Sequence, residues 1–530
     1  MTRRVQIVTA EEAAAGIPDQ ARVAVTGNNM RMAPETMLAA IQARFAESAA
    51  PRDLALIYPM MIADQVEGRS VAGSGLNRLA APGLLREVIG GSFSREPREF
   101  NDAITSGQFD AYNVSIGTVV GLVRASARGD RYYLTSTGVD TYVDPRRDGG
   151  RLNDRQSPDL SEVVDVDGEE WLRYRVPAID VAILRASYAD EFGNISFEEE
   201  PFTLGALHMA IAAKAAGGRV VVEVGAVVQG GSLDPQLVKI PGALVDQVVV
   251  APDQRGGSTV VSSGRTPEWS FSGRRRSTDQ ARSLGRRLDV AKTVIAGRAL
   301  QQMLVSGLTN LGAGVGMYDV PALARRLRVD PSELDLSIEQ GAFGGWAEPG
   351  GVAMNPEALL DTGDVFDLYT GGVLDLTILS FGEVDRFGDV NVSRFGGMLI
   401  GSGGFIDIAQ NARNILFCGT FTAGADVVFT EEGIAIRSEG RPLKFVEDVA
   451  HLTFNARSAR NRAASVAYVT ERAVFRLEEG GGLAVTEVAP GLDLERDVLA
   501  VLPFDVRVAD EVGEMDLTLA RQAERKGAEA

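Results

Sequence analysis

One segment of the chain occurs twice, and this duplication constrains the fold more than any other feature. Residues 179–196 read IDVAILRASYADEFGNIS, and residues 374–391 read LDLTILSFGEVDRFGDVN. In each copy an apolar run leads to Asp-x-Phe-Gly, where Gly193 or Gly388 can supply a backbone angle that other residues adopt only under strain. We therefore predict a buried strand, a tight turn and a second strand in each copy.

A shorter pattern supports the same conclusion. A strand followed by a glycine turn is predicted at 23–27 and again at 304–307, so that each half of the chain opens in the same way. One such pair could arise by chance, but two pairs in the same order indicate a duplicated fold with a cleft between the copies.

Apolar runs rich in β-branched residues alternate with segments of helical length. The predicted strands are 54–58, 180–184, 220–224, 245–250 and 374–379, and apolar residues at helical spacing predict a helix over 288–303. Alternation of this kind is typical of α/β proteins. We predict two related open α/β domains with mainly parallel sheets and an active-site cleft between them.

A change of composition marks the domain boundary. Gly, Ser and Arg dominate residues 253–287, including Arg274, Arg275 and Arg276 in sequence. We predict an N-terminal domain over 1–265, a linker over 266–287 and a C-terminal domain over 288–530. A basic patch for the phosphates of a nucleotide-like cofactor is the alternative interpretation of the arginines, and a solvated linker is favoured.

Charge and composition exclude several classes of function. The net charge is −19, from 53 Lys and Arg against 72 Asp and Glu, so no broad nucleic-acid surface is expected. The longest apolar stretch, 54–63, is far shorter than the roughly 20 residues of a membrane span. One cysteine, Cys418, and two histidines, His208 and His451, are too few for a metal centre built on them. We expect no metal, no membrane partner, a cytoplasmic location, and structural roles for these three residues.

Three glycine-rich loops could carry chemistry. Glu339 follows an apolar position and precedes the glycines of a Glu-x-Gly-x-x-Gly turn, which could aim its carboxylate into a cleft. The loops 309–316 and 401–405 could direct backbone N–H groups at an anion, a thioester or a developing oxyanion. Taken singly, each is more often a plain turn.

Together these segments resemble the family I coenzyme A transferases, and most closely the single-chain acetate/propionate type. The resemblance rests on the turn at Glu339 and on the segments 310–314, 388–393 and 401–404, and it extends to 75–78, 142–146, 238–242, 419–424 and 469–475. It covers the chain from about Val23 to Phe504.

The resemblance implies a mechanism. Glu339 would be the nucleophile that takes acyl-CoA through an acyl-glutamyl anhydride to a glutamyl-CoA thioester, from which a second carboxylate collects the CoA. With a reference pKa of about 4.3 a glutamate is ionised at neutral pH and needs no histidine base. Coenzyme A is then a substrate and covalent intermediate, and no cofactor is permanently bound. The implied partners are acyl-CoA and small carboxylic acids, in a homo-oligomer that is a dimer or tetramer.

The resemblance also implies roles for particular residues. An oxyanion-hole N–H comes from Gly403 or Gly404, and both stay candidates. Contacts to CoA are implied at Asn310, Gly312, Gly314, Gly341 and Gly401, and contacts to the acyl group or acceptor at Gly27, Asn28 and Ile116. Trp346 lines the cleft or belongs to the core.

Two departures from the family pattern fall where the acyl group or acceptor is expected. Relatives commonly carry Pro-Gln-Gly after the Tyr-Asn pair, whereas Tyr112-Asn113-Val114 here continues as Ser115-Ile116-Gly117, and Ile116 has no polar side chain. The loop from Gly27 to Pro34 is longer than usual before Pro-Glu. Two alternatives to a transferase therefore stay open, namely a hydrolase of CoA esters, including a ring-opening one, and a non-catalytic ligand sensor.

Overall fold

The computed structural model describes residues 4–63, 65–66, 69–70, 72–93, 99–155, 157–251, 288–348, 350–458 and 461–528. The chain divides into two compact units: the first comprises Met1–Arg274, Leu360–Asp364 and Gly397–Gly404, and the second comprises Arg275–Leu359, Val365–Gly396 and Phe405–Ala530. The predicted linker over 266–287 and the three consecutive arginines lie outside the described residues.

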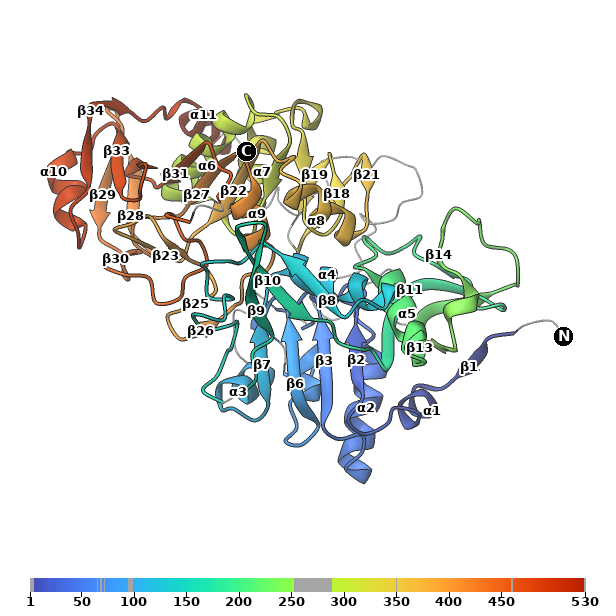
Figure 1. Cartoon of the computed structure of the whole chain (residues 1–530). Helices are drawn as coiled ribbons and strands as arrows, with labels where there is room; N and C mark the ends of the chain where they lie inside the picture. The colour runs from blue at the N-terminus through green and yellow to red at the C-terminus, as the bar shows by residue number, and fades with distance from the viewer. Residues whose placement is uncertain are drawn as a thin grey trace. The chain divides into compact units, whose positions relative to one another are not determined.

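An open parallel sheet forms the centre of the first unit (Figure 1). Its strands lie in the order β1 (Gln6–Val8), β15 (Gln247–Val250), β13 (Arg219–Val228), β11 (Val181–Asp190), β2 (Arg22–Val25), β3 (Leu54–Tyr58), β6 (Leu85–Gly90) and β7 (Asp110–Asn113). Because parallel strands end at the same edge of a sheet, the loops after β2, β3, β6 and β7 are neighbours there, as the blue strands of Figure 1 show.

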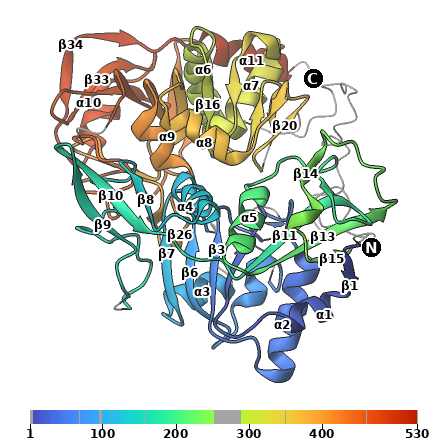
Figure 2. The same cartoon turned by 45° about the vertical axis from the view of Figure 1, so that its right-hand side comes forward.

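Helices cover this sheet. The helices α1 (Ala10–Ala15), α2 (Glu35–Ser48) and α3 (Glu99–Thr105) share one apolar core with it. The helices α4 (Ile116–Arg128) and α5 (Ala206–Ala215) pack against each other and contact β6, β11 and β13 (Figure 2). The first unit also contains a small antiparallel sheet, in the order β8 (Tyr132–Thr135), β10 (Glu169–Arg175) and β9 (Ser161–Val166).

The second unit has a mixed sheet with a parallel centre, antiparallel pairs on both sides of it and a parallel pair, β33 and β34, at one edge. Its strands run in the order β21 (Ala358–Leu359), β18 (Ala342–Phe343), β17 (Leu336–Ser337), β16 (Thr309–Leu311), β22 (Leu376–Ser380), β27 (Asn414–Cys418), β31 (Ser465–Val469), β32 (Ala473–Leu477), β33 (Leu483–Val488) and β34 (Arg507–Glu514). Neighbours from β17 to β31 are parallel. The helices α6 (Val290–Met303), α7 (Val320–Leu327) and α11 (Thr518–Ala528) pack together over its core (Figure 2). The predicted α/β class with mainly parallel sheets is confirmed.

The turn of the duplicated segment folds in the same way in both units. After β11 and after β23 (Glu383–Asp385) the carboxylates of Asp190 and Asp385 each accept the backbone N–H two residues on, at 3.0 and 2.9 Å. Gly193 and Gly388 have φ of 84° and 83°. The chain then enters β12 (Ile195–Ser196) or β24 (Val390–Asn391), antiparallel to the strand it left. The predicted strand, turn and strand are confirmed in the first copy. In the second copy the turn and the strand after it are confirmed, but the predicted single strand before the turn is divided at 381–382 into β22 and β23, which belong to different sheets.

The prediction of a strand and glycine turn over 304–307 is wrong. Leu304 is the C-cap of α6, because the helical periodicity of the preceding segment runs to its end. The counterpart of β2 is instead β16: Asp180 accepts the N–H of Arg22 beside β2, and Asp375 accepts the N–H of Leu308 beside β16, at 2.7 and 3.0 Å. Across the described ranges, no helix is long and apolar enough to cross a membrane.

Candidate functional site

Glu339 lies at the tip of a short turn in the second unit. The strands β17 and β18 pair antiparallel, the Ile338 N–H donates to the Ala342 carbonyl oxygen, and the Gly341 N–H donates back to the Ile338 carbonyl oxygen, each at 2.9 Å. The Ile338 side chain is buried, whereas Glu339 is partly exposed and accepts a hydrogen bond from the Gln340 amide at 3.1 Å. The turn therefore holds a carboxylate at the carboxyl end of a parallel strand.

A chain of buried polar side chains lies beside this turn. The Asn310 amide donates to the Tyr369 hydroxyl at 3.0 Å and accepts from Thr377 at 3.2 Å, and the Tyr369 hydroxyl donates to Ser337 at 3.1 Å. Burial raises the pKa of Tyr369, and the charge of Glu339 raises it further, so the hydroxyl stays protonated. The predicted CoA contact at Asn310 is thus a fully buried side chain that links β16 to α8 (Thr362–Thr370) and β22.

The glycine loop after β16 follows the end of β22 closely. A Cβ at Gly314 would lie 2.1 Å from Ser380 Oγ, and one at Gly312 would lie 2.5 Å from a Leu379 methyl carbon. Ser380 Oγ accepts the Val315 N–H at 2.9 Å. Packing alone therefore requires these two glycines. The loop also begins at the same sheet edge as the turn of Glu339, because β16 and β17 are parallel neighbours.

The loop Gly401–Gly404 belongs to the first unit, where it lies against the ends of β6 and β7. The Gly403 N–H donates to the Gly91 carbonyl oxygen at 3.0 Å, and the Gly403 carbonyl oxygen accepts the Ile116 N–H at 2.9 Å. No hydrogen bond from the Gly404 N–H occurs within the ranges that the structure describes. Of the two candidate donors, only Gly404 has an N–H that these contacts leave unused.

Ile116 is the first residue of α4, and its side chain is 1% exposed. A Cβ at Gly91 would lie 2.8 Å from its Cγ1, and a Cβ at Gly403 would lie 3.9 Å from its Cδ1. Ile116 therefore packs directly against the loop that carries Gly404.

The predicted substrate loop follows β2. Gly27 has φ of 149°, and a Cβ there would lie 2.7 Å from Ile62. Asn28 and Arg31 exchange backbone hydrogen bonds of 2.9 and 3.1 Å, and Asn28 is 8% exposed. The loop is therefore a compact, mostly buried turn at the edge where β6 and β7 also end.

The remaining sequence candidates are packing residues in the structure. Cys418 is buried and free, and burial raises its pKa to about 12. Trp346 belongs to the core of the second unit, with the Arg325 guanidinium 4.8 Å above its ring. His451 is buried, and its Nδ1 lies 2.6 Å from Ser393 Oγ. In the described part of the chain, no group of His, Cys, Asp and Glu side chains could hold a metal.

Comparisons with known proteins agree with this geometry. A family model described as coenzyme A transferase matches residues 7–251. The chain is 36% identical over 521 residues to the acetate CoA-transferase YdiF of Escherichia coli strain K12, covering 97% of this chain and 94% of that one. It is 35% identical over 523 residues to the caffeate CoA-transferase of Acetobacterium woodii, covering 96% of each. The chain belongs to the coenzyme A transferase family.

The fold of this CoA transferase agrees with a solved relative. The YdiF apoenzyme of Escherichia coli O157:H7 matches with a TM-score of 0.87 and 34% identity, over 97% of this chain and 96% of that one. The same protein has been solved as a thioester complex with CoA, also at a TM-score of 0.87. The relationship spans both units, so this chain is a single-chain CoA transferase.

The structure groups the predicted site residues of the CoA transferase by unit. Glu339 and Gly341 share one turn, with Asn310, Gly312 and Gly314 at the same sheet edge. Ile116, Gly401, Gly403 and Gly404 lie together in the first unit, where Gly27 and Asn28 follow a nearby strand.

Sequence reasoning assigned no role to Asn113 or Tyr142. Tyr142 lies in a segment that carries the resemblance, and Asn113 lies just before the departure at Ser115-Ile116-Gly117. The Tyr142 hydroxyl donates to the Asn113 amide oxygen, which also accepts the Ser402 N–H at 2.9 Å. The sequence offers no local signal for these contacts, because the partners are distant from one another along the chain.

Proposed function

We propose that this CoA transferase moves CoA from an acyl-CoA to a free carboxylic acid through a glutamyl-CoA thioester on Glu339. The observation that carries the proposal is the partly exposed Glu339 carboxylate at the tip of a turn closed by Gly341. The thioester complex solved for the related YdiF supports it.

The reaction balances with carboxylates and thiolates alone. The Glu339 carboxylate attacks the acyl carbonyl of the acyl-CoA, the thioester C–S bond breaks, and CoA leaves as a thiolate. The product on the enzyme is an acyl-glutamyl anhydride. The thiolate then attacks the glutamyl carbonyl and releases the first acid as its carboxylate. The second acid attacks the carbonyl of the glutamyl-CoA thioester, the C–S bond breaks, and CoA thiolate leaves a new anhydride. The thiolate then attacks the acyl carbonyl of this anhydride, which forms the new acyl-CoA and releases the Glu339 carboxylate. No step needs a proton or a histidine base.

Each of these additions places negative charge on a carbonyl oxygen. A preorganised N–H directed at that oxygen stabilises the transition state. We assign this role to the Gly404 N–H, because the Gly403 N–H is already bonded to the Gly91 carbonyl oxygen. The glycine loop after β16 and the turn at Gly341 are proposed to hold CoA, whose binding energy offsets the cost of forming an anhydride.

The substrates are proposed to be acyl-CoA esters and small carboxylic acids. Relatives named for acetate and for caffeate differ greatly in the size of the acid, so the family accommodates both. The apolar Ile116 beside the Gly403 loop favours an acid that is larger or less polar than acetate. A cytoplasmic location and a homo-oligomer, dimer or tetramer, stay predictions.

A transfer assay tests this function. Acyl-CoA esters are incubated with a panel of carboxylic acids, and new acyl-CoA and free CoA are measured in parallel. The proposal predicts new acyl-CoA that depends on the acceptor, with little free CoA. Free CoA that accumulates without an acceptor would support a hydrolase instead, and neither product with any acyl-CoA would support a ligand sensor.

A further inference from the structure

A single buried side chain holds the loop Gly401–Gly404 in the first unit. The Asn113 amide nitrogen donates to the carbonyl oxygens of Gly90 and Gly91, each at 2.9 Å, and its amide oxygen accepts the Ser402 N–H at 2.9 Å. Gly91 in turn accepts the Gly403 N–H. Asn113 therefore ties the end of β6 to Ser402, and Gly91 ties it to Gly403.

The close fit explains the glycine at 401. Gly401 has φ of 77°, and a Cβ there would lie 2.9 to 3.1 Å from the amide atoms of Asn113. A side chain at this position would be strained and would press on the amide, so the loop can approach Asn113 only through a glycine.

Tyr142 fixes the orientation of the Asn113 amide. Its side chain is fully buried, and its hydroxyl donates to the same amide oxygen that accepts the Ser402 N–H. The oxygen side of the amide has two donors. The nitrogen side has three acceptors, because the Val114 carbonyl oxygen lies 3.3 Å from it as well. A flipped amide would lose all five hydrogen bonds.

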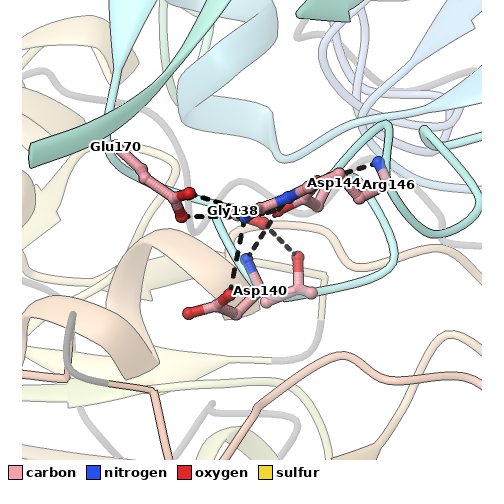
Figure 3. A network of polar contacts seen from close by, with 6 residues as sticks. Gly138, Asp140, Asp144, Arg146 and Glu170 are labelled. Atoms are coloured by element: carbon pink, nitrogen blue, oxygen red, sulfur yellow. Dashed lines mark hydrogen bonds and ion pairs between the residues drawn. The ribbon is translucent and has the colours of Figure 1, made fainter. Parts of the chain in front are cut away.

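The turn that carries Tyr142 is held by charged groups. Asp144 is 1% exposed and accepts from the Asp140 N–H and the Arg146 guanidinium, and Arg146 also pairs with Glu170 on β10 (Figure 3). Figure 3 shows these side chains converging on the turn that begins at Gly138. This network stabilises the turn that carries Tyr142. The backbone that positions the Tyr142 hydroxyl against the Asn113 amide is therefore held in place.

We infer that Asn113 and Tyr142 are positioning residues for catalysis, which keep the Gly404 N–H directed at the oxyanion by fixing the loop that carries it. The inference rests on the proposed role of Gly404. Neither side chain is assigned a contact with substrate. Their effect is expected in the chemical steps, since a donor that is displaced by a fraction of an ångström still permits binding but stabilises the transition state less.

The test compares three variants. Tyr142→Phe removes the hydroxyl that donates to the Asn113 amide oxygen. Tyr112→Phe is the matched control. Tyr112, on β7, is buried like Tyr142, but its hydroxyl donates to the Pro158 carbonyl oxygen and not to Asn113. Asn113→Asp keeps the acceptor oxygen and removes the three donated hydrogen bonds. For each variant kcat, KM for acyl-CoA and the thermal unfolding midpoint are measured.

We expect kcat of Tyr142→Phe to fall about tenfold, and that of Asn113→Asp by about 10- to 100-fold, with KM for acyl-CoA within about twofold of wild type. Tyr112→Phe should retain kcat. In Asn113→Asp, kcat relative to wild type should recover as the pH is lowered from about 8 to about 6. A buried carboxyl that faces the carbonyl oxygens of Gly90, Gly91 and Val114 has a raised pKa and donates again once protonated.

The inference is overturned if folded Tyr142→Phe has the same kcat as Tyr112→Phe, or if its loss appears in KM alone. If Asn113→Asp fails to fold, the two tyrosine variants decide. Failure of the proposed function is a separate result, because it would appear in the wild-type enzyme as the absence of a CoA adduct on Glu339.

Discussion

The backbone N–H of Ile116 donates to the carbonyl oxygen of Gly403 at 2.9 Å, which joins the start of α4 to the loop proposed to stabilise the oxyanion. This bond uses main-chain atoms only. Substitution of the Ile116 side chain can therefore change the apolar surface beside the loop without removing the bond.

We predict that Ile116→Gln shifts the ratio of kcat/KM values toward acetate and away from a branched or aromatic acid. A polar amide in place of a hydrocarbon changes discrimination by about 1 to 3 kcal/mol. Competition between acetate and the larger acid gives the ratio directly, and Ile116→Leu serves as the apolar control. An unchanged ratio would show that Ile116 does not determine the preference for the acid, which would then be assigned to the loop Gly27 to Pro34.

Gly314→Ala should destabilise the second unit. Gly314 has φ of 96°, and the added Cβ would lie 2.1 Å from Ser380 Oγ, so strain and a clash combine to cost about 1 to 3 kcal/mol or more. Gly480→Ala is the matched control, because Gly480 has φ of 85° in the same unit with no atom within 4 Å of the added Cβ. Thermal unfolding should show a larger loss for Gly314→Ala. Equal losses of stability would show that the Ser380 side chain moves away from the added Cβ without destabilising the fold.

The pH dependence of stability contains a contribution from His451. Burial and the charge of Arg394 lower its pKa from 6.5 to about 4. The unfolded chain therefore takes up this proton at a higher pH than the folded protein does, and stability falls as the pH decreases from 6.5 toward 4, by about 3 kcal/mol in total. This contribution is fully present above pH 6.5.

His451→Asn should reduce that dependence while keeping an acceptor near Ser393. We expect the difference in unfolding midpoint between about pH 7.5 and about pH 5 to be smaller in this variant than in wild type. His208→Asn is the control, since His208 lies in the other unit. A variant with the wild-type pH dependence would show that His451 does not titrate in this range.

The local parts of the fold could be predicted from the sequence. The turns after Asp190 and Asp385 are closed by hydrogen bonds between residues at most four positions apart. The apolar strand and the glycine that adopts the positive φ of the turn can both be recognised in the sequence. The end of α6 at Leu304 could not be predicted, because an apolar helix end followed by glycine has the same local pattern as a strand end.

The candidate site was only partly predictable, for a physical reason. A glycine that lets a ligand approach the backbone has the same sequence signature as a glycine required by packing, as Gly314 is against Ser380. The choice between Gly403 and Gly404 depends on the hydrogen bond to Gly91, and the role of Asn113 depends on Ser402. Contacts between such distant positions follow from the packed sheet rather than from any local pattern.

The proposed chemistry predicts ping-pong kinetics. One carboxylate must hold CoA while the first acid leaves and the second enters, so the two acids never need to be bound together. Double-reciprocal plots at several acceptor concentrations should be parallel. Intersecting lines would indicate a ternary complex and direct transfer.

The most direct test is the intact mass of the protein after incubation with a good acyl-CoA and no acceptor. The account predicts an increase by one CoA, mapped to Glu339 by peptide analysis, lost on addition of a carboxylic acid and absent in Glu339→Gln. An adduct on another residue, or an active enzyme that never carries one, would contradict it.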